Sequence, residues 1–312
     1  GEPGAGSVVV MVLPPSAGPE EIGKGGTAGP APFVDVQRYL DRMGVRVPAI
    51  HGWSQEEGWV VLEDLGDDMM LGRLQAGDPA DRLYGAAVDL LARMRVTADL
   101  GPDRDCVAFS RAFDADLYRW ELGHFVEWGL EARGVVLTRA ERGVVERHFA
   151  AIVARLASEP RGFTHRDYQS RNLMVLPGGA LAVIDFQDAL LGPREYDLVA
   201  LLRDSYVQLD QDFIDGMIGR YVGAVAALGG PELDAGRCRE VFDLLTVQRK
   251  LKDAGRFVFI DRVKGNPGFL PFVPRALSKV REAFARRPDL AELQAVLAAH
   301  VPELGEAPAS CG

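Results

Sequence analysis

The chain has 312 residues, a hydrophobic content of 47% and a formal net charge of −10 at pH 7. This length and apolar content suit one large two-lobed unit or two domains with an ample core. The acidic balance argues against nucleic acid as a main partner. No uncharged apolar run reaches the length of about 18 residues that predicts a membrane span.

The N-terminal residues and the cysteines predict a reducing, cytoplasmic location. The first residues show no basic region followed by an apolar run, so no secretory signal is predicted. The three cysteines, Cys106, Cys238 and Cys311, are odd in number and far apart. They fit neither a metal-binding spacing nor a disulfide framework.

The first predicted element is a strand over residues 7–13, which read SVVVMVL and should be buried. The Gly- and Pro-rich residues 14–32 after it predict a surface loop. Within that loop, Gly18 to Lys24 fit the start of a phosphate-binding P-loop. The next residue is Gly25 instead of Ser or Thr, and no helix can begin there promptly, so a solvated loop is the better interpretation.

A helix with proline near its start should follow. Asp35, in its first turn, is an acid that the helix dipole favours. A strand over residues 59–62 leads into acidic residues 63–68, which indicate a turn. Helices are predicted over residues 32–43, 78–96, 113–130, 137–157, 211–228, 233–256, 271–284 and 290–300, with a further one beginning near Glu195 after a turn at Gly192 and Pro193.

Two side-chain groups on these helices have a structural and a functional interpretation. The aromatic stripe in residues 113–130 is interpreted as core. Basic residues in 233–256 are spaced to share one helical face, which most often is a solvated face. The aromatic residues are Phe113, Tyr118, Trp120, Phe125 and Trp128, and the basic ones are Arg249, Lys252 and Arg256.

The most informative stretches are FTHRDYQSRNLMV at residues 163–175 and LAVIDFQD at residues 181–188. Two short apolar strands here are separated by a Pro-Gly-Gly turn at residues 177–179, which favours a hairpin. Such a hairpin would bring Asn172, before one strand, close to Asp185, after the other. The acid Asp167 lies just upstream.

This combination suits phosphoryl transfer. One carboxylate can accept or orient the proton of an attacking hydroxyl, while an amide oxygen and a second carboxylate hold Mg2+ against nucleotide phosphates. Each short motif occurs by chance in many proteins, but the compound pattern at this spacing is much rarer.

At these residues the chain resembles the protein-kinase-like superfamily. His165-Arg-Asp167 with Asn172 resembles a kinase catalytic loop, and Asp185-Phe-Gln resembles the metal-binding Asp-Phe-Gly. No Ala-Pro-Glu follows. Instead, the Gly-Pro turn and Tyr196-Asp197-Leu198 resemble the aminoglycoside phosphotransferase and choline kinase family, and the resemblance runs over about residues 7–277.

The resemblance implies an α+β, protein-kinase-like two-lobed fold. Residues 1–65 would form a small β-rich nucleotide-binding lobe that lacks its first strands. Residues 66–312 would form a large helical lobe with the catalytic loop and the substrate site. Two departures, a missing Gly-rich hairpin and Met11 in place of a phosphate-pairing lysine, leave open a nucleotide-binding protein without turnover.

The resemblance also assigns roles. Asp167 would be the catalytic acid-base residue, and Asn172 and Asp185 would hold Mg2+ beside ATP. His165 and Arg166 would support the loop. Residues 63–68 would be the hinge between the lobes, where adenine would bind backbone near Glu63, Asp64 and Leu65. Asp35 would be the acid that pairs with a strand lysine, with its helix-dipole role preferred. Gln187 and Asp188 would border the site, with a structural role equally open.

Within this family, the motifs resemble the branch of bacterial anomeric sugar kinases of peptidoglycan recycling. That branch phosphorylates the C1 hydroxyl of N-acetylmuramate and N-acetylglucosamine. This hydroxyl is more acidic than an ordinary alcohol, so a weak base such as an aspartate is adequate to accept its proton. Arg249 or Lys250 would bind the lactyl carboxylate, and the preferred alternative for each taken singly is a place on a solvated basic face. The alternative is an aminoglycoside or other small-hydroxyl phosphotransferase. A small sugar is then the expected partner, without nucleic acid, membrane or an obligate protein partner.

Overall fold

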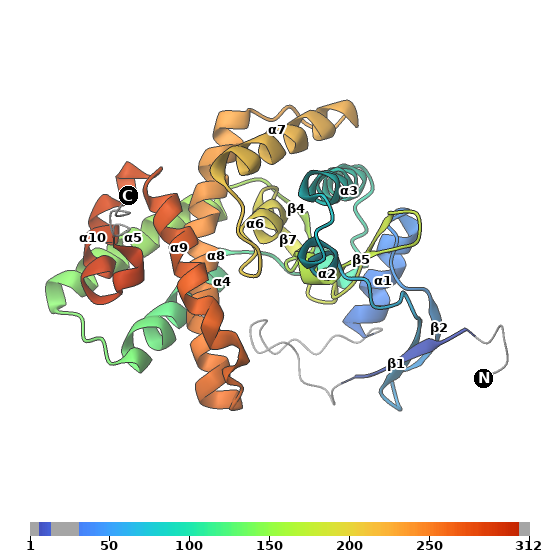
Figure 1. The fold of residues 1–312 in the computed structure, drawn as a ribbon, viewed down its shortest axis with the longest axis horizontal. Coiled ribbons are helices and arrows are strands. Elements are labelled where there is room, and N and C mark those ends of the chain that lie inside the picture. The colour runs from blue at the N-terminus through green and yellow to red at the C-terminus, as the bar shows by residue number, and fades with distance from the viewer. Residues whose placement is uncertain (1–5, 14–30, 306–312) are drawn as a thin grey trace. The chain divides into compact units, whose positions relative to one another are not determined.

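The computed structural model describes residues 6–13 and 31–305. The P-loop-like stretch with Lys24 and the third cysteine, Cys311, lie outside the described residues. The chain divides into two compact units, each assembled from separated stretches (Figure 1). The first holds residues 1–112, 161–204 and 209–235, and the second holds residues 113–160, 205–208 and 236–312. The lobe boundary between residues 65 and 66 stays a prediction.

The first unit contains a three-stranded antiparallel sheet of β1 (Val8–Val12), β2 (Ile50–Ser54) and β3 (Trp59–Glu63), in the order β1-β3-β2. The strand predicted over residues 7–13 is confirmed, but its predicted burial is wrong. Val10 and Val12 are 60% and 78% exposed. β-branched residues favour a strand, but they do not show whether another layer packs against it, and at this edge strand the side chains stay exposed.

Helix α1 (Pro32–Arg42) places Val34, Val36 and Leu40 in the core. It begins with proline and is followed by Gly44 at φ +72°, as expected for a helix end. The carboxylate of Asp35 accepts a hydrogen bond from the backbone N–H of Val107 at 2.6 Å. That contact gives Asp35 a structural role, in which it fixes the short helix η1 (Val107–Phe109).

The predicted hairpin is confirmed. Strands β5 (Leu173–Val175) and β6 (Leu181–Val183) pair antiparallel, and the turn between them uses Gly178 and Gly179 at φ +89° and +87°. The pairing continues past β6, because the backbone N–H of Ile184 donates to the carbonyl of Asn172 at 3.1 Å. Asp185 is therefore the first residue beyond the last pair.

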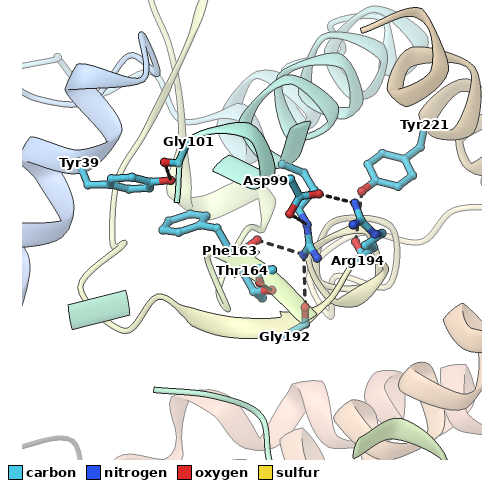
Figure 2. Close-up of polar contacts among 10 residues, drawn as sticks. Tyr39, Asp99, Gly101, Phe163, Thr164, Gly192, Arg194 and Tyr221 are labelled. Carbon is cyan, nitrogen blue, oxygen red and sulfur yellow. Dashed lines mark hydrogen bonds and ion pairs between the residues drawn. The ribbon is translucent and has the colours of Figure 1, made fainter. Parts of the chain in front are cut away.

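Strands β4 (Arg161–Thr164) and β7 (Leu190–Pro193) also pair antiparallel and were not predicted. The turn predicted at Gly192 and Pro193 is wrong by about two residues, because both residues belong to β7 and the turn follows them. Arg95 joins the two strands to its own helix: Nη1 donates to the carbonyls of Phe163 at 3.2 Å and Gly192 at 3.3 Å (Figure 2).

Four further helices complete the first unit. Arg194, after β7, donates to Asp99 at 2.5 Å, and Arg220 forms a bidentate pair with Asp89, with its closer oxygen at 2.6 Å. These contacts tie the helix of residues 80–100 to the helix of residues 211–227 and to the end of β7. The helices are α2 (Met70–Gln75), α3 (Ala80–Leu100), α6 (Tyr196–Leu202) and α7 (Gln211–Ala227).

The second unit is helical over its described residues. The single helix predicted over residues 113–130 is instead an α-helix followed by a π-helix. At the junction a Cβ on Gly255 would lie 2.8 Å from the carbonyl oxygen of His124, so two helix backbones meet there. The elements are α4 (Ala115–His124), η2 (Phe125–Leu130), η3 (Glu131–Arg133), α5 (Arg139–Ala157), α8 (Ala235–Lys264), η5 (Pro267–Phe272), α9 (Val273–Phe284), η6 (Pro288–Leu290), α10 (Ala291–His300) and η7 (Pro302–Leu304).

Burial tests two further predictions. The aromatic stripe is core at Phe113, Tyr118 and Phe125, each fully buried, but Trp120 is 39% exposed. Cys106 and Cys238 are buried free thiols. Within the part of the chain that the structure describes, every helix falls short of the length and apolarity that a membrane crossing requires.

Candidate active site

The catalytic loop lies between β4 and the short helix η4 (Ser170–Asn172). Its backbone is held by Asp197, whose carboxylate accepts hydrogen bonds from the N–H groups of His165 at 2.7 Å and Arg166 at 2.9 Å. Arg166 has φ +79°, a left-handed conformation that needs such support in a residue other than glycine. Asp197 also lies in the first turn of α6, where the helix dipole favours an acid, but that local position does not reveal its contact with the loop.

The His165 ring links the loop to the end of β6. Its Nδ1 accepts a hydrogen bond from the backbone N–H of Asp167 at 3.2 Å. Nε2 therefore carries the hydrogen and donates to the carbonyl of Ile184 at 3.0 Å. These bonds agree with the predicted supporting role. Three residues after Asp167, Ser170 donates from its N–H and its hydroxyl to the carboxylate of Asp204.

The structure brings the three predicted catalytic and metal residues together. The side-chain amide of Asn172 donates from Nδ2 to the Asp185 carboxylate at 3.0 Å and to the backbone carbonyl of Asp167 at 2.8 Å. Asn172 is 8% exposed, whereas Asp185 is exposed and has φ +64°. A buried amide thus aligns an accessible carboxylate with the catalytic loop.

These side chains fit a magnesium ion. Both hydrogens of the Asn172 Nδ2 are used, so Oδ1 is left to act as a ligand beside the Asp185 carboxylate. Mg2+ prefers hard oxygen ligands and completes its shell with water and substrate phosphates. Gln187 donates from Nε2 to the second carboxylate oxygen of Asp185 at 2.8 Å, so an ion that takes that oxygen would have to displace the amide.

Asp188 lies in a dense charge cluster. Burial raises the pKa of Asp188, Arg166 and Arg111 lower it, and Asp167 and Asp185 raise it further. Sequence reasoning missed Arg111, which donates to the carbonyl of Gln187 on one side of Asp188. No motif surrounds Arg111, and 76 residues separate it from that partner.

At the predicted hinge, the side chains are engaged locally. Arg46 donates from Nη1 to Glu63 at 2.8 Å, and this hydrogen bond holds the pKa of Glu63 below its ordinary value. Asp64 accepts a hydrogen bond from the backbone N–H of Gly66 at 2.8 Å. The nucleotide role of Glu63, Asp64 and Leu65 stays a prediction about the position of their backbone.

The basic residues of α8 form a buried network in the second unit. Arg249 and Lys250 are 3% and 2% exposed, so the interpretation as a solvated basic face is wrong for both. Lys250 lies 2.8 Å from the carboxylate of Asp253 and 3.2 Å from the hydroxyl of Ser205. Burial alone would raise the pKa of Asp253, but Lys250, Lys252 and Arg249 together bring it well below its ordinary value.

The sequence matches the phosphotransferase enzyme family over residues 3–235, a stretch that contains the catalytic loop and Asp185. The chain belongs to that family. This phosphotransferase is 35% identical to a protein of Pseudomonas putida over 95% of its own length and 82% of the relative's. It is 36% identical to one of Pseudomonas aeruginosa, over 96% and 84%. Both relatives are named N-acetylmuramate/N-acetylglucosamine kinase.

Solved structures confirm the predicted kinase-like α+β fold of this phosphotransferase. A choline/ethanolamine kinase family protein from Mesorhizobium loti matches with a TM-score of 0.59 and 14% identity, over 94% of this chain and 87% of that one. The ADP-bound aminoglycoside phosphotransferase APH(2'')-Ib matches with a TM-score of 0.52 and 17% identity, over 81% and 82%. At these identities the similarity establishes the fold alone.

Proposed function

We propose that this phosphotransferase is a kinase that uses ATP and Mg2+ to phosphorylate the anomeric C1 hydroxyl of N-acetylmuramate and N-acetylglucosamine. The observation that carries the chemistry is the contact of Asn172 with both Asp185 and the backbone of Asp167. The names of the relatives support the acceptor sugars. The setting we propose is cell-wall recycling in the cytoplasm.

In this proposal Asp167 orients the C1 hydroxyl and accepts its proton as the phosphoryl group is transferred. A hemiacetal hydroxyl is more acidic than an ordinary alcohol, so a carboxylate of ordinary basicity suffices. Asn172 Oδ1 and the Asp185 carboxylate would hold Mg2+, which neutralises charge on the phosphates when bound. Gln187 and Asp188 border this group and are proposed to contact the sugar or to order the metal ligands.

Two further assignments belong to the same proposal. The backbone of residues 63–65 would bind adenine, within a nucleotide-binding lobe of residues 1–65, and residues 66–312 would supply the catalytic loop and the acceptor site. Arg249 or Lys250 would bind the lactyl carboxylate that N-acetylmuramate has and N-acetylglucosamine lacks. Their burial supports this role, because the electrostatic attraction between a cation and an anion is stronger where water is excluded.

The deciding experiment is a phosphate-transfer assay with ATP and Mg2+ on N-acetylmuramate, N-acetylglucosamine and kanamycin, with Asp167→Asn as the control. We expect an acid-labile sugar 1-phosphate, formed at least about 100-fold more slowly by the variant. Transfer to kanamycin alone would move the substrate to the aminoglycosides. Nucleotide binding without transfer to any acceptor would favour a protein without turnover.

The carboxylate assignment has its own test. Arg249→Ala should raise the KM for N-acetylmuramate about tenfold or more and leave the KM for N-acetylglucosamine within about twofold, since only one sugar has the anion. An equal change for both sugars would remove Arg249 from the carboxylate site.

A further inference from the structure

Arg111 contacts the segment that carries the proposed metal ligand, although it lies outside every motif. Its Nη2 donates to the backbone carbonyls of Gln187 at 2.9 Å and Ala189 at 3.0 Å. Its own carbonyl accepts a hydrogen bond from the N–H of Leu191 at 2.9 Å. The residue therefore holds both sides of Asp188 and the start of β7 at once.

The segment from Asp185 to Ala189 needs external support. It leaves β6 with Asp185 at φ +64°, a left-handed conformation that is uncommon outside glycine and costs free energy. Within the segment, the backbone bond between the N–H of Ala189 and the carbonyl of Phe186, at 3.0 Å, closes a single turn. Asn172 restrains the Asp185 side chain at the start of the segment, and Arg111 restrains the backbone at its end.

The positive charge of Arg111, taken alone, would weaken Mg2+ binding, whereas its hydrogen bonds to the segment that carries Asp185 would strengthen it. Arg111 is close enough to Asp188 to interact with it and with the neighbouring Arg166. A guanidinium beside Asp188 lowers the attraction of the site for Mg2+, so its removal should tighten metal binding if charge were its whole contribution. If Arg111 instead fixes the ligand geometry, its removal should weaken binding. The two roles thus predict changes of opposite sign.

We propose that Arg111 is a positioning residue for the magnesium–nucleotide site: its hydrogen bonds to the carbonyls of Gln187 and Ala189 hold Asp185 in its ligand conformation. The inference rests on the proposed function only in taking Asp185 as a Mg2+ ligand, and is independent of the identity of the acceptor. Residues that orient metal ligands typically change metal affinity about 10- to 100-fold when replaced.

The test measures Mg2+ binding by the full chain with saturating ADP, by isothermal titration calorimetry. Arg111→Met, which keeps the volume and removes the donors, should weaken Mg2+ binding about tenfold or more. Arg111→Lys keeps the charge with a shorter donor and should weaken it about threefold. Arg220→Met, which removes the surface pair with Asp89, is the control and should lower Tm without changing Mg2+ affinity.

Unchanged or tighter Mg2+ binding by Arg111→Met would overturn the proposal. If that variant does not fold, Arg111→Lys decides: a threefold loss supports the positioning role and wild-type affinity overturns it. Failure of the proposed function looks different, because wild-type protein would then bind Mg2+ and ADP normally while phosphorylating neither sugar. A wild-type protein that binds no Mg2+ with ADP would overturn the metal assignment and this inference together.

Discussion

The carboxylate of Asp197 accepts the backbone N–H of Arg166 at 2.9 Å, and both residues are only 3% exposed. The second carboxylate oxygen accepts the N–H of His165 at 2.7 Å. One buried acid therefore satisfies two successive amides of a loop whose backbone is left-handed at Arg166. This contact connects the start of α6 to the position of Asp167.

Asp197→Asn should lower both stability and turnover. An asparagine offers one acceptor, and its NH2 group faces a backbone N–H that then has no acceptor, a loss of about 1–3 kcal/mol in the free energy of unfolding. Because the loop also positions Asp167, we expect kcat to fall about tenfold or more. Urea unfolding and steady-state kinetics measure the two effects.

Asp210→Asn is the matched control for that change. Asp210 caps α7 by accepting the N–H of Phe213 at 2.7 Å, and asparagine caps helices equally well. Its free energy of unfolding should stay within about 0.5 kcal/mol of wild type. If both variants behave alike, Asp197 has no special role in the loop.

Gly162→Ala should destabilise the first unit. A Cβ there would lie 2.4 Å from Nη2 of Arg95 and 2.5 Å from Oδ1 of Asp99, and Arg95 is too buried to move away. Overpacking of this kind costs about 1–3 kcal/mol. Gly216→Ala, in the exposed interior of α7 with open space around it, should instead stabilise by up to about 1 kcal/mol. Equal unfolding midpoints for the two variants would contradict the predicted clash.

Asp253→Asn should destabilise the second unit by about 3 kcal/mol, because the change removes the charged carboxylate that lies 2.8 Å from the buried Lys250 and one of the two carboxylates within 4.0 Å of Lys252. The double variant Lys250→Met/Asp253→Leu should recover part of that loss, since apolar residues of similar volume carry no desolvation cost. Urea unfolding of both variants at pH 7 tests the prediction. A double variant no more stable than the single one would count against it.

Glu141 should contribute a pH-dependent part of the stability. The N–H of Thr138 donates to its carboxylate in a capping box at the start of α5, His300 lies 2.9 Å away, and these bonds lower the pKa of Glu141 to about 2. A lowered pKa stabilises the fold above the ordinary value of 4.5 and loses that contribution as pH falls toward 2. Glu141→Gln should therefore lower Tm at pH 7, and its difference from wild type should shrink below about pH 4.5. A constant difference across this range would exclude the ionised carboxylate as the cause.

Local sequence was enough to predict the centre of the candidate site. The Pro-Gly-Gly turn between two apolar strands fixed the hairpin, and the hairpin placed Asn172 beside Asp185. These residues are 13 positions apart, and the contact follows from strand pairing alone. The phosphotransferase fold followed from the motifs around the same residues.

The parts that sequence reasoning missed depend on partners far along the chain. Arg111 and Asp197 act on backbone groups 76 and 31 residues away, and neither contact has a local pattern. The burial of β1 was mispredicted for a related reason, because the exposure of a strand's side chains depends on which elements pack against its sheet. The burial of Lys250 depends in part on a distant partner, because the hydroxyl of Ser205 is 45 residues away in the sequence, whereas Asp253 lies only three residues further along the same helix.

The first unit is assembled from separated stretches of the chain, so parts of it must wait for later residues during synthesis. Arg95 is 2% exposed, yet its acceptor at Gly192 lies 97 residues later in the chain. A ribosome takes roughly 5–20 s to add that many residues. Until then the guanidinium of Arg95 has Asp99 of its own helix within 3.3 Å and gains the carbonyl of Phe163 after 68 residues, but it lacks the carbonyl of Gly192, so α3 cannot reach its final packing. Completion of the candidate site is then a late event that follows the synthesis of β7.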